Sequence, residues 1–202
     1  MSSLLASQRR HRGTAETHYN GDVSFDIRQF EKSDFETLWQ IDQACFDPQL
    51  AYSRPELAFY MRRPSAFTLV AEKKVNGIPP VAGKSIASKS DGERKILGFI
   101  VAEKRRQTGH IITIDVIAEA RRLGVGSELL DTAEQKLREN GAAAVELETA
   151  VNNEAAIRFY RQKGYFVEKT VRGYYSNHLD ALVMGKILTA SKAQAEGRSY
   201  HS

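Results

Sequence analysis

R-R-L-G-V-G, residues 121–126, lies between an apolar run, Ile111 to Ile117, and an amphipathic run that begins near Ser127. The apolar run predicts a strand, the two glycines predict a tight turn, and the amphipathic run predicts a helix. Such a turn gathers unpaired backbone N–H groups at the positive end of a helix dipole, where phosphate binds well. We therefore expect a phosphorylated ligand at this turn.

Two well-known phosphate sites do not match this turn. A P-loop needs Gly-Lys followed by Ser or Thr, whereas Gly126 is followed by Ser127 and Glu128, which disfavours a nucleoside triphosphate. A dinucleotide fingerprint needs a third glycine where the chain has Leu129, although Glu146 and Glu148 lie at a suitable distance downstream. A dinucleotide site therefore stays open as an alternative, and so does a glycine turn that holds no ligand.

The composition predicts one compact domain. The chain has 202 residues, of which 42% are hydrophobic and 27% charged, enough for one substantial core. Cys45 is the only cysteine, so no intramolecular disulfide can form. Neither the apolar stretch of a signal peptide nor a run of roughly 20 apolar residues is present. We expect a soluble, cytoplasmic protein that makes no membrane contact.

The net charge of +4 comes mostly from the two ends of the chain. Residues 1–20 and 189–202 together hold five basic residues, including Arg9, Arg10 and Arg12, and two acidic ones. The body is nearly neutral and has no basic stripe with interleaved aromatic residues, so we expect no specific nucleic-acid binding. We interpret residues 1–22 as a flexible basic tail and 189–202 as a second flexible tail, and a weak ribosome contact through the basic tail stays open.

Strand and helix patterns alternate along the chain. Apolar residues alternate over Ser24 to Phe30, as in a half-buried strand, and Ser33 with Glu36 predicts a capping box for a helix that reaches Cys45. Polar and turn-forming residues predict a long loop over 73–95. Further strands are expected at Ala66 to Glu72, Ile96 to Glu103, Ile111 to Ile117, Val145 to Thr149, Phe166 to Arg172 and Asp180 to Ile187, and further helices at Arg54 to Met61, Ser127 to Asn140 and Glu154 to Lys163.

A second motif follows the glycine turn. Asn153, Ala156, Tyr160, Gly164 and Tyr165 form the pattern N-x-x-A-x-x-x-Y-x-x-x-G-Y. Together with R-R-L-G-V-G, this pattern resembles the GNAT superfamily of acetyl-CoA-dependent N-acetyltransferases. Within that superfamily, L-E-T at 147–149 and the segment 172–184 resemble the ribosomal-protein alanine N-acetyltransferases and the wider group of protein N-terminal acetyltransferases.

The resemblance implies a fold and a donor substrate. The fold would be an α/β (α+β) domain over residues 23–188, with a mixed, mostly antiparallel sheet that has helices on both faces and is splayed at the acetyl-CoA site. Acetyl-CoA would be the co-substrate. Its pyrophosphate would lie at Arg121, Arg122, Gly124, Val125, Gly126 and Ser127, and its pantetheine arm at Val116 and Asn153. Asn153 also suits a helix N-cap, and the two roles can coexist.

The chemistry needs an unprotonated amine. An α-amino group has a pKa of about 7.7 to 8.0, so modest help from a base suffices at neutral pH. The resemblance implies that Glu148 removes the proton, through a water molecule, and that Tyr160 protonates the leaving thiolate. Two plainer interpretations stay open, a carboxylate at a strand end for Glu148 and a core aromatic residue for Tyr160.

Two adjacent tyrosines, Tyr174 and Tyr175, occupy a turn between the last two expected strands. The resemblance implies that one contacts a peptide backbone, and Tyr52 could form the opposite wall. We expect acetyl transfer to the N-terminal α-amine of a protein. Transfer to a small amine or a lysine, and acyl-CoA binding without turnover, are the alternatives. His110 and His178 lack partners at metal-ligand spacing, so no metal is expected, and we expect a monomer or weak homodimer.

Overall fold

A computed structural model describes residues 24–74, 94–175 and 178–188. The two predicted tails, 1–22 and 189–202, lie outside these residues. Of the predicted loop 73–95, only the two ends are described. They belong to strands, because one strand continues to Lys74 and the next begins at Arg94.

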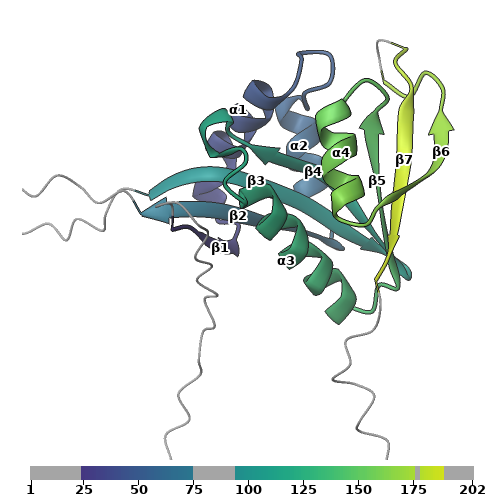
Figure 1. Ribbon diagram of the computed structural model, residues 1–202. Coiled ribbons are helices and arrows are strands. Elements are labelled where there is room, and N and C mark those ends of the chain that lie inside the picture. Colours follow the sequence, from purple (N-terminus) through teal and green to yellow (C-terminus); the bar gives the residue numbers. More distant parts are fainter. Residues whose placement is uncertain (1–23, 75–93, 176–177, 189–202) are drawn as a thin grey trace, which may run out of the picture.

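The strands form one mixed sheet, in the order β1-β2-β3-β4-β5-β7-β6 (Figure 1). They are β1 (Asp26–Gln29), β2 (Ala66–Lys74), β3 (Arg94–Arg105), β4 (Thr108–Val116), β5 (Ala144–Ala150), β6 (Phe166–Val171) and β7 (Ala181–Ile187). β4 and β5 run parallel, and the other neighbouring pairs are antiparallel. This confirms the mixed, mostly antiparallel sheet predicted from the sequence.

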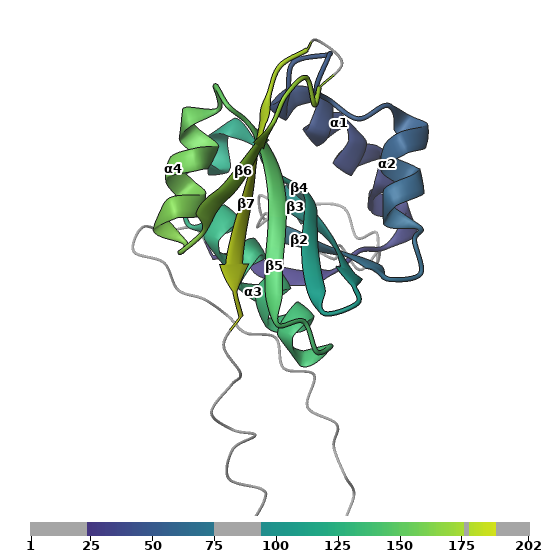
Figure 2. The same ribbon diagram turned by 90° about the vertical axis from the view of Figure 1, so that its right-hand side faces the viewer.

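Helices cover both faces of this sheet (Figure 2). They are α1 (Phe35–Cys45), α2 (Arg54–Met61), α3 (Val125–Glu139) and α4 (Glu154–Gln162), with short 3-10 turns η1 (Lys32–Asp34) and η2 (Ala118–Ala120). Successive residues of β3 point to opposite faces. Phe99 therefore packs in one core with Leu38 of α1, and Ile100 packs in the other core with Leu130 of α3. The two cores together fix the sheet between the helix pairs.

The start of α1 differs from the prediction. The capping box is formed by Glu31 and Asp34 around η1, with the backbone N–H of Glu31 donating to Asp34 at 2.8 Å. The box predicted at Ser33 and Glu36 is wrong. Glu36 instead forms an exposed ion pair with Arg54 at 2.9 Å.

β4 and β5 separate part-way along their length. Their pairing ends at Ile111, although β4 continues to Val116. The register between β3 and β4 skips Ile112, which makes this residue a β-bulge at the point of separation. A bulge bends and twists its strand. The second half of β4 therefore diverges from β5, and the splay predicted from the sequence is present.

Candidate functional site

The glycine turn at the splayed end of β4 has the backbone geometry of an anion site. Arg122 and Gly124 both adopt left-handed conformations, with φ of 63° and 86°. Left-handed residues in such turns orient successive N–H groups into a concavity that binds anions. No side chain caps the first turn of α3, which begins at Val125, so its leading N–H groups have no intrahelical acceptor. The turn and the helix N-terminus form one potential phosphate site.

Gly126 brings this turn against the end of β4. A Cβ atom added at Gly126 would lie 3.7 Å from a methyl carbon of Val116 and 3.8 Å from the ring of Phe159. The predicted phosphate-binding residues and the predicted pantetheine strand are therefore in contact. Phe159 was not among the predicted residues, since its contact with the turn depends on how α4 packs.

Arg121 is directed toward β4 and α1. Its Nε donates to the carbonyl oxygen of Val116 at 3.1 Å, and its Nη2 donates to the sulfur of Cys45 at 3.7 Å. The Cys45 thiol donates to the same carbonyl at 3.4 Å. Arg122 is exposed as well, but none of the residues that the structure describes forms an ion pair with it. Of the two predicted arginines, Arg122 is better placed to meet a phosphate.

Glu148 lies on β5 beside the splay and contacts a histidine. Its Oε2 is 2.7 Å from Nε2 of His110 on β4, and the two side chains are 21% and 10% exposed. In the parallel register His110 lies opposite Glu146, so Glu148 is two residues further along β5 and on the same face. Glu148 thus has one partner to orient it and retains access to solvent.

A second carboxylate lies on the other side of His110. Its Nδ1 is 3.8 Å from Glu103, which is almost fully buried. Glu103 accepts a hydrogen bond from Arg63 at 2.8 Å and also pairs with Arg105. Glu103 is therefore a charged neighbour of the imidazole, whose Nδ1 has no hydrogen-bond partner among the described residues. His110 was not predicted as a site residue, because its partners come from strand register and not from sequence spacing.

Tyr160 is buried on α4. Its ring lies 5.2 Å from the Phe159 ring and 5.6 Å from the Tyr165 ring, between centroids. Burial, followed by the charges of Asp115 and Tyr175, raises the pKa of Tyr160 well above its ordinary value. The phenol therefore keeps its proton at neutral pH and can donate it in a hydrogen bond. At the start of the same helix, Asn153 accepts from the N–H of Ala156 at 3.1 Å, so the predicted N-cap is present.

Tyr174 and Tyr175 stand near Glu148. Their rings meet edge to face with centroids 5.0 Å apart. Burial is the main cause that raises the pKa of each, to about 12 for Tyr175, and the charge of Glu148 contributes to both shifts. Tyr174 is 49% exposed. The turn between β6 and β7 therefore places one exposed tyrosine and one half-buried tyrosine near Glu148, the candidate base.

Tyr52 forms the other side of the splay. Its hydroxyl donates to the carbonyl oxygen of Ile112 at 3.4 Å, at the bulge of β4. Its ring lies 5.3 Å from that of Tyr60 on α2. Burial and then the charges of Tyr60 and Tyr174 raise its pKa. The structure thus places Tyr52 and the β6–β7 tyrosines at the same end of the sheet and adds Tyr60, while a role of these residues in substrate binding stays a prediction.

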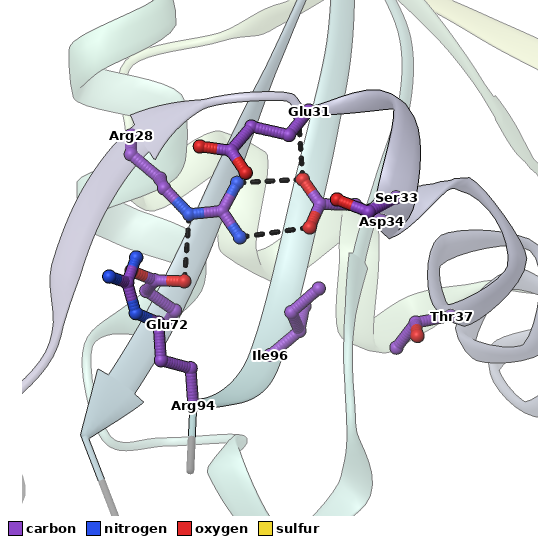
Figure 3. Close-up of a pocket in the computed structure, with 8 residues that line it drawn as sticks. All are labelled: Arg28, Glu31, Ser33, Asp34, Thr37, Glu72, Arg94 and Ile96. Carbon is purple, nitrogen blue, oxygen red and sulfur yellow. Dashed lines mark hydrogen bonds and ion pairs between the residues drawn. The ribbon is translucent and has the colours of Figure 1, made fainter. Parts of the chain in front are cut away.

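A separate hollow of about 430 Å³ lies on the β1 side of the sheet (Figure 3). Its charged groups pair with one another: Arg28 binds both oxygens of Asp34, at 2.6 and 2.9 Å, and Glu72 at 2.7 Å. Arg94 also reaches Glu72, at 3.3 Å. These mutual pairs brace β1 against β2 and η1. The splay between β4 and β5 is therefore the better candidate site.

The comparisons with known proteins agree with this geometry. The family described as "Acetyltransferase (GNAT) family" matches residues 35–165. The chain belongs to the GNAT acetyltransferase family. An N-alpha-acetyltransferase of Sulfurisphaera tokodaii is 38% identical over 77 residues, which cover 38% of this chain and 46% of that relative. The chain therefore spans about half the length of this relative.

Two further matches cover most of the GNAT domain. An uncharacterised N-acetyltransferase of Methanocaldococcus jannaschii is 30% identical over 161 residues, 79% of this chain and 90% of that protein. The crystal structure of Ard1 from Thermoplasma volcanium has 28% sequence identity and a TM-score of 0.66, covering 83% of this chain and 99% of that one. The GNAT fold predicted from the sequence motifs is confirmed.

Among residues 24–74, 94–175 and 178–188, no group of three or more His, Cys, Asp or Glu side chains could hold a metal ion. Within the same residues, no helix is long and apolar enough to cross a membrane.

Proposed function

We propose that this chain transfers the acetyl group of acetyl-CoA to the N-terminal α-amine of a protein, in the manner of the ribosomal-protein alanine N-acetyltransferases. The observation that carries the proposal is the position of Glu148. This carboxylate is oriented by His110 at 2.7 Å, keeps access to solvent, and lies near the exposed tyrosine turn at the splayed end of the sheet. A base that lies between β4, on the acetyl-CoA side, and the tyrosines of the β6–β7 turn is well placed to deprotonate an incoming amine.

The donor side of the site fits the pyrophosphate of acetyl-CoA. Left-handed Arg122 and Gly124 and the uncapped start of α3 supply N–H groups, and Gly126 leaves their approach free of a side chain. Arg122 would add a positive charge. Acetyl-CoA supplies a thioester, whose carbonyl carbon is the electrophile. The residues of the chain bind this thioester and carry out the proton transfers of the reaction.

Glu148 and Tyr160 handle the two protons of the transfer. The amine nitrogen forms a bond to the acetyl carbon, the carbon–sulfur bond breaks, and the amine loses one proton. Glu148, oriented by His110, takes that proton through a water molecule. Tyr160, which stays protonated because it is buried, donates toward the leaving thiolate. The proton taken by Glu148 then returns to Tyr160 by way of solvent, so that both side chains are restored and the products are the acetylated amine and the free thiol of coenzyme A.

The acceptor side favours a peptide over a free lysine. Tyr52, Tyr60 and Tyr174 give aromatic walls with hydroxyl groups that can bond a peptide backbone. A lysine amine, with a pKa of about 10.4, would need stronger deprotonation than an α-amine. One histidine-paired carboxylate therefore suits the α-amine better.

A peptide panel tests the proposal. The purified chain is given acetyl-CoA and peptides that begin with Ala, Ser, Gly or Met, and the free thiol released is measured with a thiol reagent. Matched controls are the same peptides acetylated at the N-terminus, with and without an internal lysine. We expect thiol release only with free N-termini. Release from the acetylated lysine peptide would support the lysine alternative, and acetyl-CoA binding with no release for any acceptor would indicate a binding module.

A further inference from the structure

Two carboxyl groups are buried between α1 and β4, behind the wall that carries Tyr52. Asp42 has no exposed surface and Asp115 is 1% exposed. Each uses only one oxygen: Oδ2 of Asp115 accepts from the Thr113 hydroxyl at 3.1 Å, and Oδ2 of Asp42 accepts from the Tyr52 N–H at 2.9 Å and from Gln43 at 3.0 Å. The Oδ1 atoms of both are buried and have no hydrogen-bond partner in the described part of the chain.

Within residues 24–74, 94–175 and 178–188, no cationic side chain is bonded to either carboxyl group. The titratable side chains that face the pair are Cys45 of α1, Tyr52 of the α1–α2 loop, Arg121 of the glycine turn and Tyr160 of α4. Arg121 is exposed, and its side chain donates hydrogen bonds to Val116 and Cys45. Two ionised carboxylates would therefore repel each other in a dry region, and two acceptor oxygens would stay unsatisfied.

A single proton resolves both problems. A protonated carboxyl group is a hydrogen-bond donor, so one bond between the two groups can satisfy both unpartnered oxygens. We propose that Asp115 carries this proton and donates it in a hydrogen bond to Asp42. This bond positions Tyr52, on the side of the site that receives the peptide, against β4, on the side that binds acetyl-CoA. This inference rests on the proposed function. Both residues act by positioning other groups and neither touches the reacting atoms.

The assignment of the proton to Asp115 follows from the hydrogen bonds. Asp42 accepts two bonds from neutral donors, which favours its ionised form, whereas Asp115 accepts one. Burial, followed by the charge of Asp42, raises the pKa of Asp115 well above its ordinary value. Burial also raises the pKa of Asp42, to about 6, and its bonds to Tyr52 and Gln43 oppose that shift.

The bond would join the two halves of the site. On one side, Asp42 holds the N–H of Tyr52, while Trp39 and Gln43 donate to the carbonyl of the same residue at 3.3 and 2.8 Å. On the other side, Asp115 immediately precedes Val116, at the end of β4 that contacts the phosphate turn. Loss of the bond should therefore make the position of Tyr52 less fixed and weaken peptide binding, with less effect on the rate of acetyl transfer.

Asp115→Asn and Asp115→Ala in the full chain test this role. The asparagine amide can donate to Asp42 in the same direction as the proposed carboxyl group, so D115N should keep kcat and the peptide KM within about twofold. D115A removes the donor, and the peptide KM should rise roughly 2- to 10-fold, as expected for one hydrogen bond, while kcat changes little. In the wild type the peptide KM should also rise at alkaline pH, as Asp115 ionises, and D115N should lack this rise. Equal pH profiles of the peptide KM in the wild type and D115N would overturn the proposal.

Infrared difference spectra provide a readout independent of activity. The spectrum of the wild type minus that of D115N at pH 7 should show the carbonyl band of a protonated carboxyl group, shifted on exchange into D₂O. Carboxylate bands alone would refute the shared proton even if D115A is impaired or fails to fold. If the band is present but no peptide is acetylated, the carboxyl pair stands and the proposed function fails.

Discussion

Gly126→Ala separates the binding role of the glycine turn from its structural role. Gly126 is the second residue of α3, and an added Cβ would make ordinary contacts of 3.7 Å to Val116 and 3.8 Å to Phe159. Alanine is favoured over glycine within helices by about 0.5 to 1 kcal/mol. The free energy of unfolding should therefore stay unchanged or rise by up to about 1 kcal/mol.

The same methyl group should weaken acetyl-CoA binding. It would fill space beside Val116 and Phe159 at the first turn of α3, and we expect it to hinder the approach of the pyrophosphate to the N–H groups of that turn. Hydrogen bonds to charged groups contribute about 1.5 to 3 kcal/mol, so the loss of one should raise the Kd for acetyl-CoA roughly 10- to 150-fold. Urea denaturation gives the stability and isothermal titration calorimetry gives the affinity. A protein that becomes more stable and binds acetyl-CoA less well is the expected result.

Two other glycines provide the controls. Gly124 and Gly141 both adopt left-handed conformations, with φ of 86° and 84°, and a Cβ at Gly141 would meet nothing within 4 Å. Alanine should cost roughly 1 to 2 kcal/mol of stability at either position. Only Gly124→Ala should also weaken acetyl-CoA binding, because Gly141 lies at the far end of α3. An affinity of Gly126→Ala within twofold of the wild type would mean that the pyrophosphate does not lie on this turn.

Three further predictions concern the chemistry and its pH dependence. Glu148→Gln should lower kcat by roughly 10²- to 10⁴-fold, as for other general bases, with the Kd for acetyl-CoA unchanged; full activity in single-turnover assays would remove Glu148 from the mechanism. Tyr160→Phe keeps the ring contacts and should lower kcat without a matching loss of stability, whereas an unchanged kcat would leave Tyr160 as a core aromatic residue. The folded-state pKa of Asp115 is raised, so its contribution to stability is full below about pH 4, the unfolded value, and is lost as pH rises toward the folded value. Relative to D115N, the free energy of unfolding of the wild type should fall by about 1.4 kcal/mol per pH unit within that window; parallel stability curves for the two proteins would contradict this.

Helix ends show how far local sequence signals reach. The helix expected at Arg54 to Met61 is present, and Ser53 and Glu56 form a capping box at its start. α3 begins at Val125, two residues before the predicted start, because its N-cap is a left-handed glycine and not a polar side chain. At α1 the capping box predicted from Ser33 and Glu36 is wrong, because Glu36 pairs with a more distant residue, Arg54. Local sequence spacing therefore located the cap of α4 at Asn153, but not the caps before α1 and α3.

The residues of the candidate site fall into two groups, those that a local sequence pattern indicates and those that depend on contacts with distant segments. Gly124, Gly126, Asn153 and Tyr160 stand at fixed spacings within single turns or helices, so the sequence pattern identified them. His110 gained its importance from Glu148, 38 residues away, through the parallel pairing of β4 and β5. The direction of the Arg121 side chain likewise depends on Cys45, 76 residues earlier. Neither contact has a signal in local spacing.

The sequence by itself determined the order of strands and helices, the glycine turn and the membership of the GNAT family. These depend on periodicity, on capping and on glycine conformation, all of which act over a few residues. Tertiary structure alone decided that His110 orients Glu148, that Tyr52 closes on the bulge at Ile112, and that Asp42 and Asp115 are buried together. Such pairs depend on strand register and on exclusion of water, and both arise only when distant segments pack.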